Sequence, residues 1–154
     1  MNLLKLVASI AISFAAGGIG SLATAPNIPT WYANLDKPPF QPPNWVFGPV
    51  WSVLYLLMGI ALYLVWTAKT GNSKKRAYVL FGIQLFLNTL WSLFFFGLHW
   101  TWIAVIIIVT LWIAIALTIR EFAKFSKPAA WLLAPYIAWV TFASLLNIAV
   151  AVLN

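Results

Sequence analysis

Long apolar runs alternate with short polar segments along this chain, and their spacing predicts an all-α membrane protein. A transmembrane helix takes roughly 20 mostly apolar residues to cross a hydrocarbon core of about 30 Å. The runs of that length are residues 3–25, 44–68, 76–98, 101–119 and 129–153. We therefore expect a single domain, residues 1–154, folded as an integral membrane bundle of five transmembrane helices. The first run begins like a signal peptide but is too long for one and lacks a convincing cleavage site, so we interpret it as a membrane span.

The segment between the first two runs is rich in proline and aromatic residues. Residues 31–55 read WYANLDKPPFQPPNWVFGPVWSVLY. Proline fixes its own φ and biases the preceding residue toward extended conformations, so two Pro-Pro pairs should keep this chain stiff and non-helical. We expect residues 26–43 to form a lid over the bundle, and the rest of the stretch to start the second helix.

Composition and charge agree with a membrane location and indicate an orientation. The chain is 64% hydrophobic and 7% charged, which is too apolar for the surface of a water-soluble domain. The net charge of +7 comes from basic residues between the apolar runs, where they act as topological signals, so nucleic-acid binding is not expected. The positive-inside rule predicts a cell-membrane protein with a cytoplasmic N-terminus, and with the C-terminus and residues 26–43 outside. The basic residues on the predicted cytoplasmic side are Lys5, Lys69, Lys74, Lys75, Arg76, Arg120, Lys124 and Lys127, against Lys37 alone on the other.

Three predicted helices each carry a face that combines aromatic and neutral polar side chains at helical spacing. The faces are Trp51, Tyr55 and Met58 in the second helix, Gln84, Asn88, Trp91 and Phe95 in the third, and Trp139, Ala143 and Asn147 in the fifth. Unpaired amides are costly in hydrocarbon, so these faces should point into the bundle. Two interpretations stay open, a ligand pocket and interhelical hydrogen bonding by the amides. In the first helix, the stripe Ser9, Ser13, Gly17 and Ser21 favours close packing, and Gly17, Gly18 and Gly20 could leave room for a flat ligand.

The residue inventory excludes several kinds of site. The chain has no cysteine, so disulfides, iron–sulfur clusters and thiol nucleophiles are ruled out. No charged residue lies in the interior of a predicted span, away from its ends, which argues against a proton relay or a pair of catalytic carboxylates. A multi-ligand metal site cannot be built around the single histidine, His99; one axial bond to haem is conceivable, but a hydrogen-bonding role is favoured. Asp36 is expected to fix the loop or pair with a neighbouring cation. A cavity for a large, flat, mostly apolar ligand remains, and indole rings suit stacking on it.

Three motifs carry a family resemblance: PVWSVLY at residues 49–55, QLFLNTLW at residues 84–91 and PYIAWVTFASLLN at residues 135–147. With them, nearly the whole chain resembles the translocator protein family, also called the tryptophan-rich sensory protein or peripheral benzodiazepine receptor family. The resemblance implies a five-helix bundle, commonly a homodimer, that binds porphyrins and isoquinoline or benzodiazepine-type ligands. It implies no required cofactor, with protoporphyrin or haem as a ligand.

The motifs and the helical spacing together select the candidate site. The expected ligand-binding residues are Tyr32, Pro42, Trp51, Tyr55, Gln84, Asn88, Trp91, Trp139, Ala143 and Asn147, of which Tyr32 and Pro42 belong to the lid. Bacterial members of the family are reported to break down protoporphyrin in light and oxygen, which makes Trp51 and Trp139 the redox-active candidates. The cholesterol-recognition pattern of animal members needs a tyrosine and a basic residue where this chain reads IAVAVLN, so high-affinity sterol binding is not expected.

Three functions are compatible with these features. The tryptophan faces favour a protein that senses or photo-oxidatively degrades porphyrins. The alternatives are a translocator of tetrapyrroles or lipids, and a ligand-responsive regulatory partner without chemistry. The lack of buried charge and of inverted repeats counts against coupled transport, although facilitated passage survives that objection.

Overall fold

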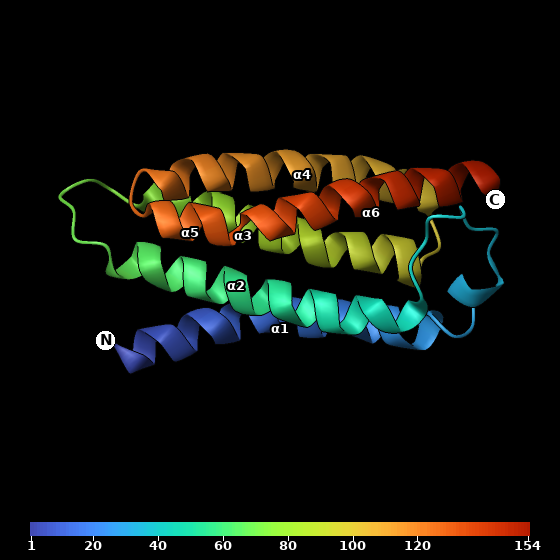
Figure 1. Cartoon of the computed structure of the whole chain (residues 1–154), viewed down its shortest axis with the longest axis horizontal. Coiled ribbons are helices and arrows are strands. Elements are labelled where there is room, and N and C mark those ends of the chain that lie inside the picture. Colours follow the sequence, from blue (N-terminus) through green and yellow to red (C-terminus); the bar gives the residue numbers. More distant parts are fainter.

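The computed structural model describes all 154 residues as an all-helical bundle (Figure 1). Its α-helices are α1 (Leu3–Asn27), α2 (Phe47–Thr67), α3 (Lys75–Ser92), α4 (Thr101–Ala123), α5 (Lys127–Leu132) and α6 (Ala134–Leu153). Shorter turns are η1 (Tyr32–Asn34), η2 (Asn44–Val46), which leads into α2, and the π-helical η3 (Leu93–Gly97), which ends α3. When α5 and α6 are taken together, five helices are long and apolar enough to cross a membrane. The predicted five-helix membrane bundle is confirmed.

Two predicted helix boundaries differ from the structure for identifiable reasons. The fourth helix continues beyond residue 119 to Ala123, because Glu121 pairs there with Arg76 at 3.4 Å and with Lys124 at 2.7 Å. The last span is two helices that meet at Leu133. Pro135 lies in the first turn of α6 and has no N–H to continue the hydrogen bonding of α5, so the helix is interrupted.

The helices run back and forth between two ends of the bundle (Figure 1). The N-terminus and the connections 68–74 and 124–126 lie at one end. We call it the basic end, because every lysine and arginine of the chain except Lys37 lies in or next to these segments. The segment 28–43, the turn 98–100 and the C-terminus lie at the opposite end, the loop end. Among the helices, α1 packs on α2 and α3, and α4 packs on α3 and α6.

Small residues allow α1 and α2 to approach closely. A Cβ atom built on Gly59 of α2 would lie 2.6 Å from the Cα atom of Ile10, so only glycine fits at this crossing. Ser9 and Ser13 of α1 are fully buried. The first half of the small-residue stripe, Ser9 and Ser13, therefore serves packing within the chain.

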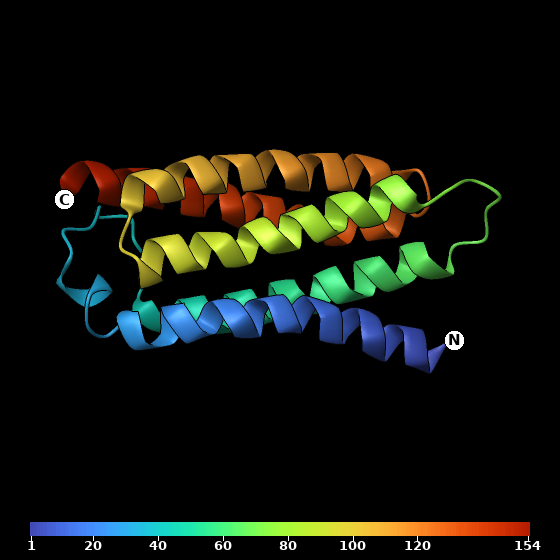
Figure 2. The same cartoon turned by 180° about the vertical axis from the view of Figure 1, so that it is seen from behind.

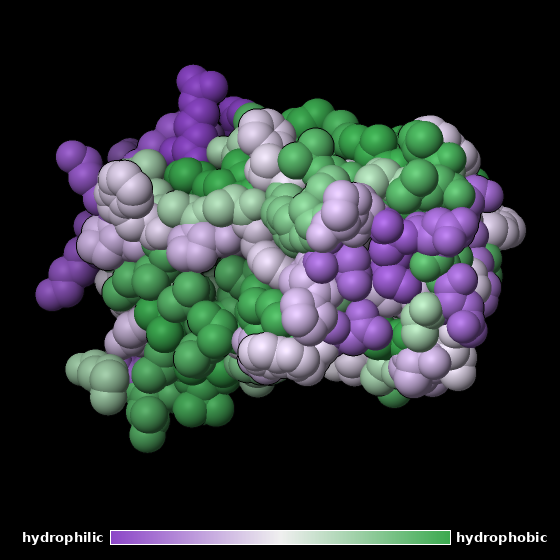
Figure 3. Space-filling model, turned by 45° about the vertical axis from the view of Figure 1, so that its right-hand side comes forward, coloured by the Kyte–Doolittle hydropathy of each residue, from purple (hydrophilic) through white to green (hydrophobic).

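The outer surface is apolar over large areas. In Figure 3 hydrophobic side chains cover much of the visible face, while hydrophilic residues gather toward the ends. Large apolar side chains such as Leu22, Phe86 and Ile106 are 77%, 64% and 67% exposed. A surface of this kind is stable against lipid and not against water, which supports an integral membrane protein.

Candidate functional site

A cavity of about 370 Å³ lies inside the half of the bundle nearest the loop end. Its walls come from α1, α2, α6 and the end of α3 with η3, and Ile28 and Tyr32 cover it from the loop. The predicted residues that line it are Tyr32, Trp51, Tyr55, Trp91, Trp139, Ala143 and Asn147. We call it the aromatic pocket.

Aromatic rings touch one another in a continuous series around the aromatic pocket. Ring centroids are 6.1 Å apart for Trp139 and Phe47, 6.0 Å for Phe47 and Tyr32, 6.3 Å for Tyr32 and Phe95, 5.5 Å for Phe95 and Trp91, 6.2 Å for Trp91 and Trp51, and 5.8 Å for Trp51 and Tyr55. These distances are typical of interacting aromatic pairs. The series presents π faces and edges from four parts of the chain, which suits a flat conjugated ligand.

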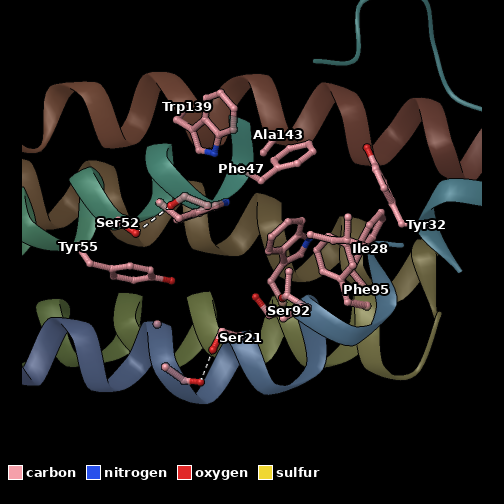
Figure 4. A pocket seen from close by; sticks show the side chains of 18 of the residues that line it. Ser21, Ile28, Tyr32, Phe47, Ser52, Tyr55, Ser92, Phe95, Trp139 and Ala143 are labelled. Carbon is pink, nitrogen blue, oxygen red and sulfur yellow. Dashed lines mark hydrogen bonds between the residues drawn. The ribbon is translucent and has the colours of Figure 1, made fainter. Parts of the chain in front are cut away.

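One buried hydrogen-bond donor in this wall has no partner. The indole Nε1 of Trp139 is buried and donates to no protein atom. Figure 4 shows this nitrogen on the edge of the ring that faces the cavity. By contrast, the Nε1 of Trp91 donates to the Oδ1 of Asn147 at 3.0 Å. Since buried donors are nearly always paired, the free N–H of Trp139 is a candidate donor to a ligand, and the side chains that cover this nitrogen would have to move aside to admit an acceptor.

The remaining polar groups of the pocket are neutral. The Ser21 hydroxyl donates to the Gly18 carbonyl at 2.7 Å, and the Ser52 hydroxyl donates to the Gly48 carbonyl at 2.9 Å (Figure 4). Both serines are exposed, and they lie at the open side between α1 and α2. The lining contains no Asp, Glu, Lys, Arg or His. The pocket therefore offers no carboxylate, amine or imidazole for acid–base catalysis, and its ionisable groups are the hydroxyls of Tyr32 and Tyr55.

A buried polar layer closes the pocket on the side toward the basic end. The Tyr55 hydroxyl donates to the Oδ1 of Asn88. The Nδ2 of Asn88 donates to the Tyr136 hydroxyl at 2.9 Å, and that hydroxyl donates to the Oε1 of Gln84 at 2.7 Å. The Nε2 of Gln84 faces the sulfur of Met58 at 3.9 Å. These bonds join α2, α3 and α6, so the amides serve as interhelical hydrogen-bonding groups beneath the cavity.

The lid is held by contacts at two places along the segment 28–43. The Lys37 ammonium donates to the carbonyls of Tyr32, Ala33 and Leu35 at 2.9, 3.2 and 3.1 Å, so it stabilises the turn η1 and does not pair with Asp36. The backbone of Asp36 is bonded instead to the side chain of Asn154. Its N–H donates to Oδ1 at 3.1 Å, and its carbonyl accepts from Nδ2 at 2.8 Å.

Tyr32 and the histidine turn complete the cover. Tyr32 is 1% exposed, its hydroxyl donates to the Gln41 Oε1 at 3.3 Å, and its burial raises the pKa of the phenol to about 12. His99 adopts a φ of 62°, stacks on Trp31 with centroids 4.1 Å apart, and makes a hydrogen bond through Nε2 to the Asn27 Oδ1 at 3.1 Å. The histidine thus has the hydrogen-bonding role that was favoured for it.

Comparison with known proteins identifies the family. The sequence model of the TspO/MBR family matches residues 9–153. The chain is 49% identical over 154 residues to the Tryptophan-rich protein TspO of Archaeoglobus fulgidus, covering 100% of this chain and 99% of that one. The chain belongs to the TspO/MBR family. It is also 44% identical to the Tryptophan-rich protein TspO of Chlorobaculum tepidum, over 99% of this chain and 98% of that one. The Translocator protein of Ovis aries is 43% identical over 121 residues, which are 76% of this chain and 70% of that protein.

Membership of the TspO/MBR family confirms the resemblance and supports a membrane role as a sensor or translocator. Within this TspO/MBR chain, the structure separates the predicted site residues by depth. Gln84 and Asn88 lie in the polar layer below the pocket, and Pro42 lies in the lid without lining the cavity. Trp51 and Trp139, the predicted redox-active residues, both line the pocket and are half-buried.

Several lining residues were not among the predicted binding residues. Phe47 precedes Trp51 by four residues and Phe95 follows Trp91 by four, so the helical spacing that selected the tryptophans also points to them. Gly17, Gly18 and Gly20 were suggested to leave room for a flat ligand. Gly17 and Gly18 line the pocket, whereas Gly20 does not. The other lining residues without a prediction are Phe14, Ser21, Thr24, Ala25, Ile28, Gly48, Ser52, Ser92, Phe96 and Leu146. Ser21 belongs to the small-residue stripe and Ile28 to the predicted lid, and nothing in the local sequence of the others distinguishes them from ordinary span residues.

Proposed function

We propose that this chain binds porphyrins, and smaller flat ligands of the isoquinoline and benzodiazepine types, in the aromatic pocket. The observation that carries the proposal is the free N–H of Trp139 within a continuous aromatic wall. A ligand nitrogen or oxygen that reaches this N–H accepts a hydrogen bond that no protein atom makes. Ring stacking on the neighbouring aromatics supplies the rest of the affinity.

The size and charge of the pocket support this class of ligand. A volume of about 370 Å³ lies within the range of roughly 300 to 1,000 Å³ that small-molecule sites occupy, toward its lower limit. A two- or three-ring ligand fits inside, whereas a tetrapyrrole would insert one side and leave its carboxylates at the open side between α1 and α2. No acidic residue lines the pocket to repel those carboxylates.

We further propose that a bound porphyrin is sensed or photo-oxidatively degraded. Light excites the porphyrin, an indole in contact with it donates one electron, and dioxygen takes that electron from the reduced porphyrin, which leaves superoxide and an indole radical cation. The porphyrin then returns one electron to the indole, and the resulting porphyrin radical cation combines with superoxide, so that dioxygen oxidises the porphyrin and the indole is regenerated. Trp51 and Trp139 are the candidate donors, because both line the aromatic pocket. Loss of porphyrin in excess of protein would indicate an enzyme, and stoichiometric binding would indicate a sensor.

The test measures binding and bleaching separately. Protein in detergent micelles is titrated with protoporphyrin in the dark, and the absorbance of the porphyrin is followed. Trp139→Phe keeps an aromatic ring and removes the N–H, so we expect about three- to tenfold weaker binding, the equivalent of one hydrogen bond. Trp131→Phe is the matched control, because Trp131 is 75% exposed on α5 and lies outside the pocket.

Two results would contradict parts of this proposal. If Trp139→Phe binds porphyrin as tightly as Trp131→Phe, the free N–H does not orient the ligand. If Trp51→Phe combined with Trp139→Phe binds porphyrin and bleaches it in light and air as fast as the unmutated chain, the redox roles are wrong while the binding site stands.

A further inference from the structure

A second cavity, of about 410 Å³, lies between α1, α2 and α3 in the half of the bundle toward the basic end. Its walls include Ile12 of α1, Leu62 and Trp66 of α2, and Tyr78, Gly82 and Leu85 of α3. It shares no residue with the aromatic pocket. Figure 2 shows α1 and α3 diverging toward the end that carries the N-terminus, with α2 behind them. We call this cavity the basic-end groove.

Each of the three helices that form the basic-end groove carries or is followed by a lysine. These lysines lie closer to the basic end than the residues that line the groove. Lys5 precedes Ile12 by seven residues, which places both on one face of α1, and its Nζ lies 5.4 Å from the centroid of the Trp66 ring in the groove wall. Lys75 precedes Gly82 by seven residues and so shares its face of α3. Lys69 lies two residues beyond the end of α2 at Thr67.

These ammonium groups are not neutralised within the chain. The acidic residues are Asp36 and Glu121. Asp36 lies in the segment at the loop end, and Glu121 pairs with Arg76 and Lys124. The mouth of the basic-end groove therefore carries uncompensated positive charge beside an apolar interior.

The depth of the groove matches one leaflet of a bilayer. Ten residues separate Lys75 from Leu85, which is about 15 Å at 1.5 Å per helical residue. That length is half of a hydrocarbon core of about 30 Å. Trp66 and Tyr78 lie between the lysines and the deeper aliphatic residues, as amphipathic aromatics do at a membrane interface.

We propose that the basic-end groove binds an anionic phospholipid of the adjacent leaflet. One acyl chain lies along Gly82, where an added Cβ would meet no atom within 4 Å and the wall is open. The phosphate lies among Lys5, Lys69 and Lys75. A lipid with net negative charge is preferred over a zwitterionic one, since the headgroup cation of the latter would face the same lysines.

A second copy of this chain is the competing occupant, and charge argues against it. In a two-fold symmetric contact through this groove, the same lysines from both copies would approach one another. Like charges at an interface oppose association unless they are paired, and no free carboxylate is present at this end.

The experiment is native mass spectrometry of the full chain released from detergent micelles. Phosphatidylglycerol and phosphatidylcholine with the same acyl chains are offered at equal concentration. Lys5→Gln with Lys75→Gln is compared with Arg120→Gln with Lys127→Gln, which removes the same charge at the same end but outside the groove. We expect the unmutated chain to retain phosphatidylglycerol preferentially. A membrane-proximal lysine contributes about fivefold, so the groove pair should lower that retention by about 25-fold and the control pair by less than about threefold.

A steric variant tests the position of the acyl chain. Gly82→Leu places a side chain in the open wall, where its first added carbon meets no atom within 4 Å, and Ile83→Leu on the neighbouring exposed position is its control. We expect Gly82→Leu to lower retention of both lipids and Ile83→Leu to leave it unchanged. Circular dichroism and thermal unfolding confirm that each variant is folded.

Several outcomes would overturn the inference. Equal retention of the two lipids by the unmutated chain removes the preference for anionic lipid. Equal losses in the two charge variants show a general effect of net charge. Unchanged lipid retention in Gly82→Leu, with a shift from dimer to monomer masses, assigns the groove to a second copy. Porphyrin binding does not enter this test, so its result is independent of the proposed function.

Discussion

Gly17→Ala should destabilise the bundle, although alanine is the better helix former. A Cβ atom at Gly17 would lie 2.7 Å from Cδ2 and 2.8 Å from Cζ of Tyr55. The Tyr55 ring is held on both sides, because its hydroxyl is bonded to Asn88 and its face packs on Trp51 at 5.8 Å. The ring cannot move away from the new methyl group without weakening one of these contacts.

The magnitude follows from opposing terms. Overpacking a well-filled site costs about 1 to 3 kcal/mol. Alanine recovers about 0.8 to 1 kcal/mol over glycine in a helix, and a lost Tyr55–Asn88 hydrogen bond adds about 0.5 to 1.5 kcal/mol of cost. Together these terms give a net loss of about 0.5 to 3.5 kcal/mol, with about 2 kcal/mol in the middle of the range. Gly18→Ala is the matched control: a Cβ there meets nothing within 4 Å, so it should be neutral or stabilise by up to about 1 kcal/mol.

The assay is the free energy of unfolding in mixed micelles titrated with sodium dodecyl sulfate, followed by helical circular dichroism. A double-mutant cycle locates the effect, since Gly17→Ala in a Tyr55→Ala background has no ring to displace and should become neutral or stabilising. The reasoning is refuted if Gly17→Ala and Gly18→Ala behave alike. It is equally refuted if the cost of Gly17→Ala persists when the Tyr55 ring is absent.

Further predictions concern the polar layer and the lid. Asn88→Ala leaves two buried tyrosine hydroxyls without their amide partner and should cost about 2 to 4 kcal/mol in the same unfolding assay, and a loss below 1 kcal/mol would contradict it. Asn154→Ala removes the two bonds to the Asp36 backbone, so the Asp36 amide should exchange hydrogen faster, while Asn34→Ala, which loses a bond within the loop, should leave that amide unchanged. Burial raises the pKa of Tyr32 to about 12, so the folded state keeps this proton longer than the unfolded chain. The associated stability should be lost as pH rises from about 10 to about 12, and Tyr32→Phe should remove one late-titrating phenol from the tyrosinate absorbance curve.

The pattern of side chains along the sequence predicts which way a residue faces around its helix. It is a poorer guide to whether that residue lies at the level of the cavity along the bundle axis. Trp51, Trp91 and Trp139 were selected by helical spacing, and all three line the pocket. Asn88 and Gln84 share a face with Trp91 but lie about one and two turns closer to the basic end, where their amide groups are hydrogen-bonded to tyrosine hydroxyls. Spacing gives the angle around a helix, whereas the position of a cavity along the axis depends on how several helices pack.

The contact that ties the lid to the end of the last helix could not be predicted from the sequence. The hydrogen bond between Asp36 and Asn154 joins residues that are 118 positions apart in the sequence, and no local pattern predicts it. The break between α5 and α6 is different, because Pro135 was visible in the sequence and its missing N–H is a sufficient reason for an interruption. The lid was recognised from its prolines, but its attachment depends on a terminal asparagine that local reasoning had no reason to single out.

The polar layer beneath the aromatic pocket blocks the path along the axis of the bundle. Tyr55, Asn88, Tyr136 and Gln84 are hydrogen-bonded to one another across the middle of the bundle, and each is at most 9% exposed. A molecule that travelled along the bundle axis would have to break these bonds and leave several polar groups unpaired in a medium without water. A ligand that reaches the pocket therefore leaves by the side from which it came.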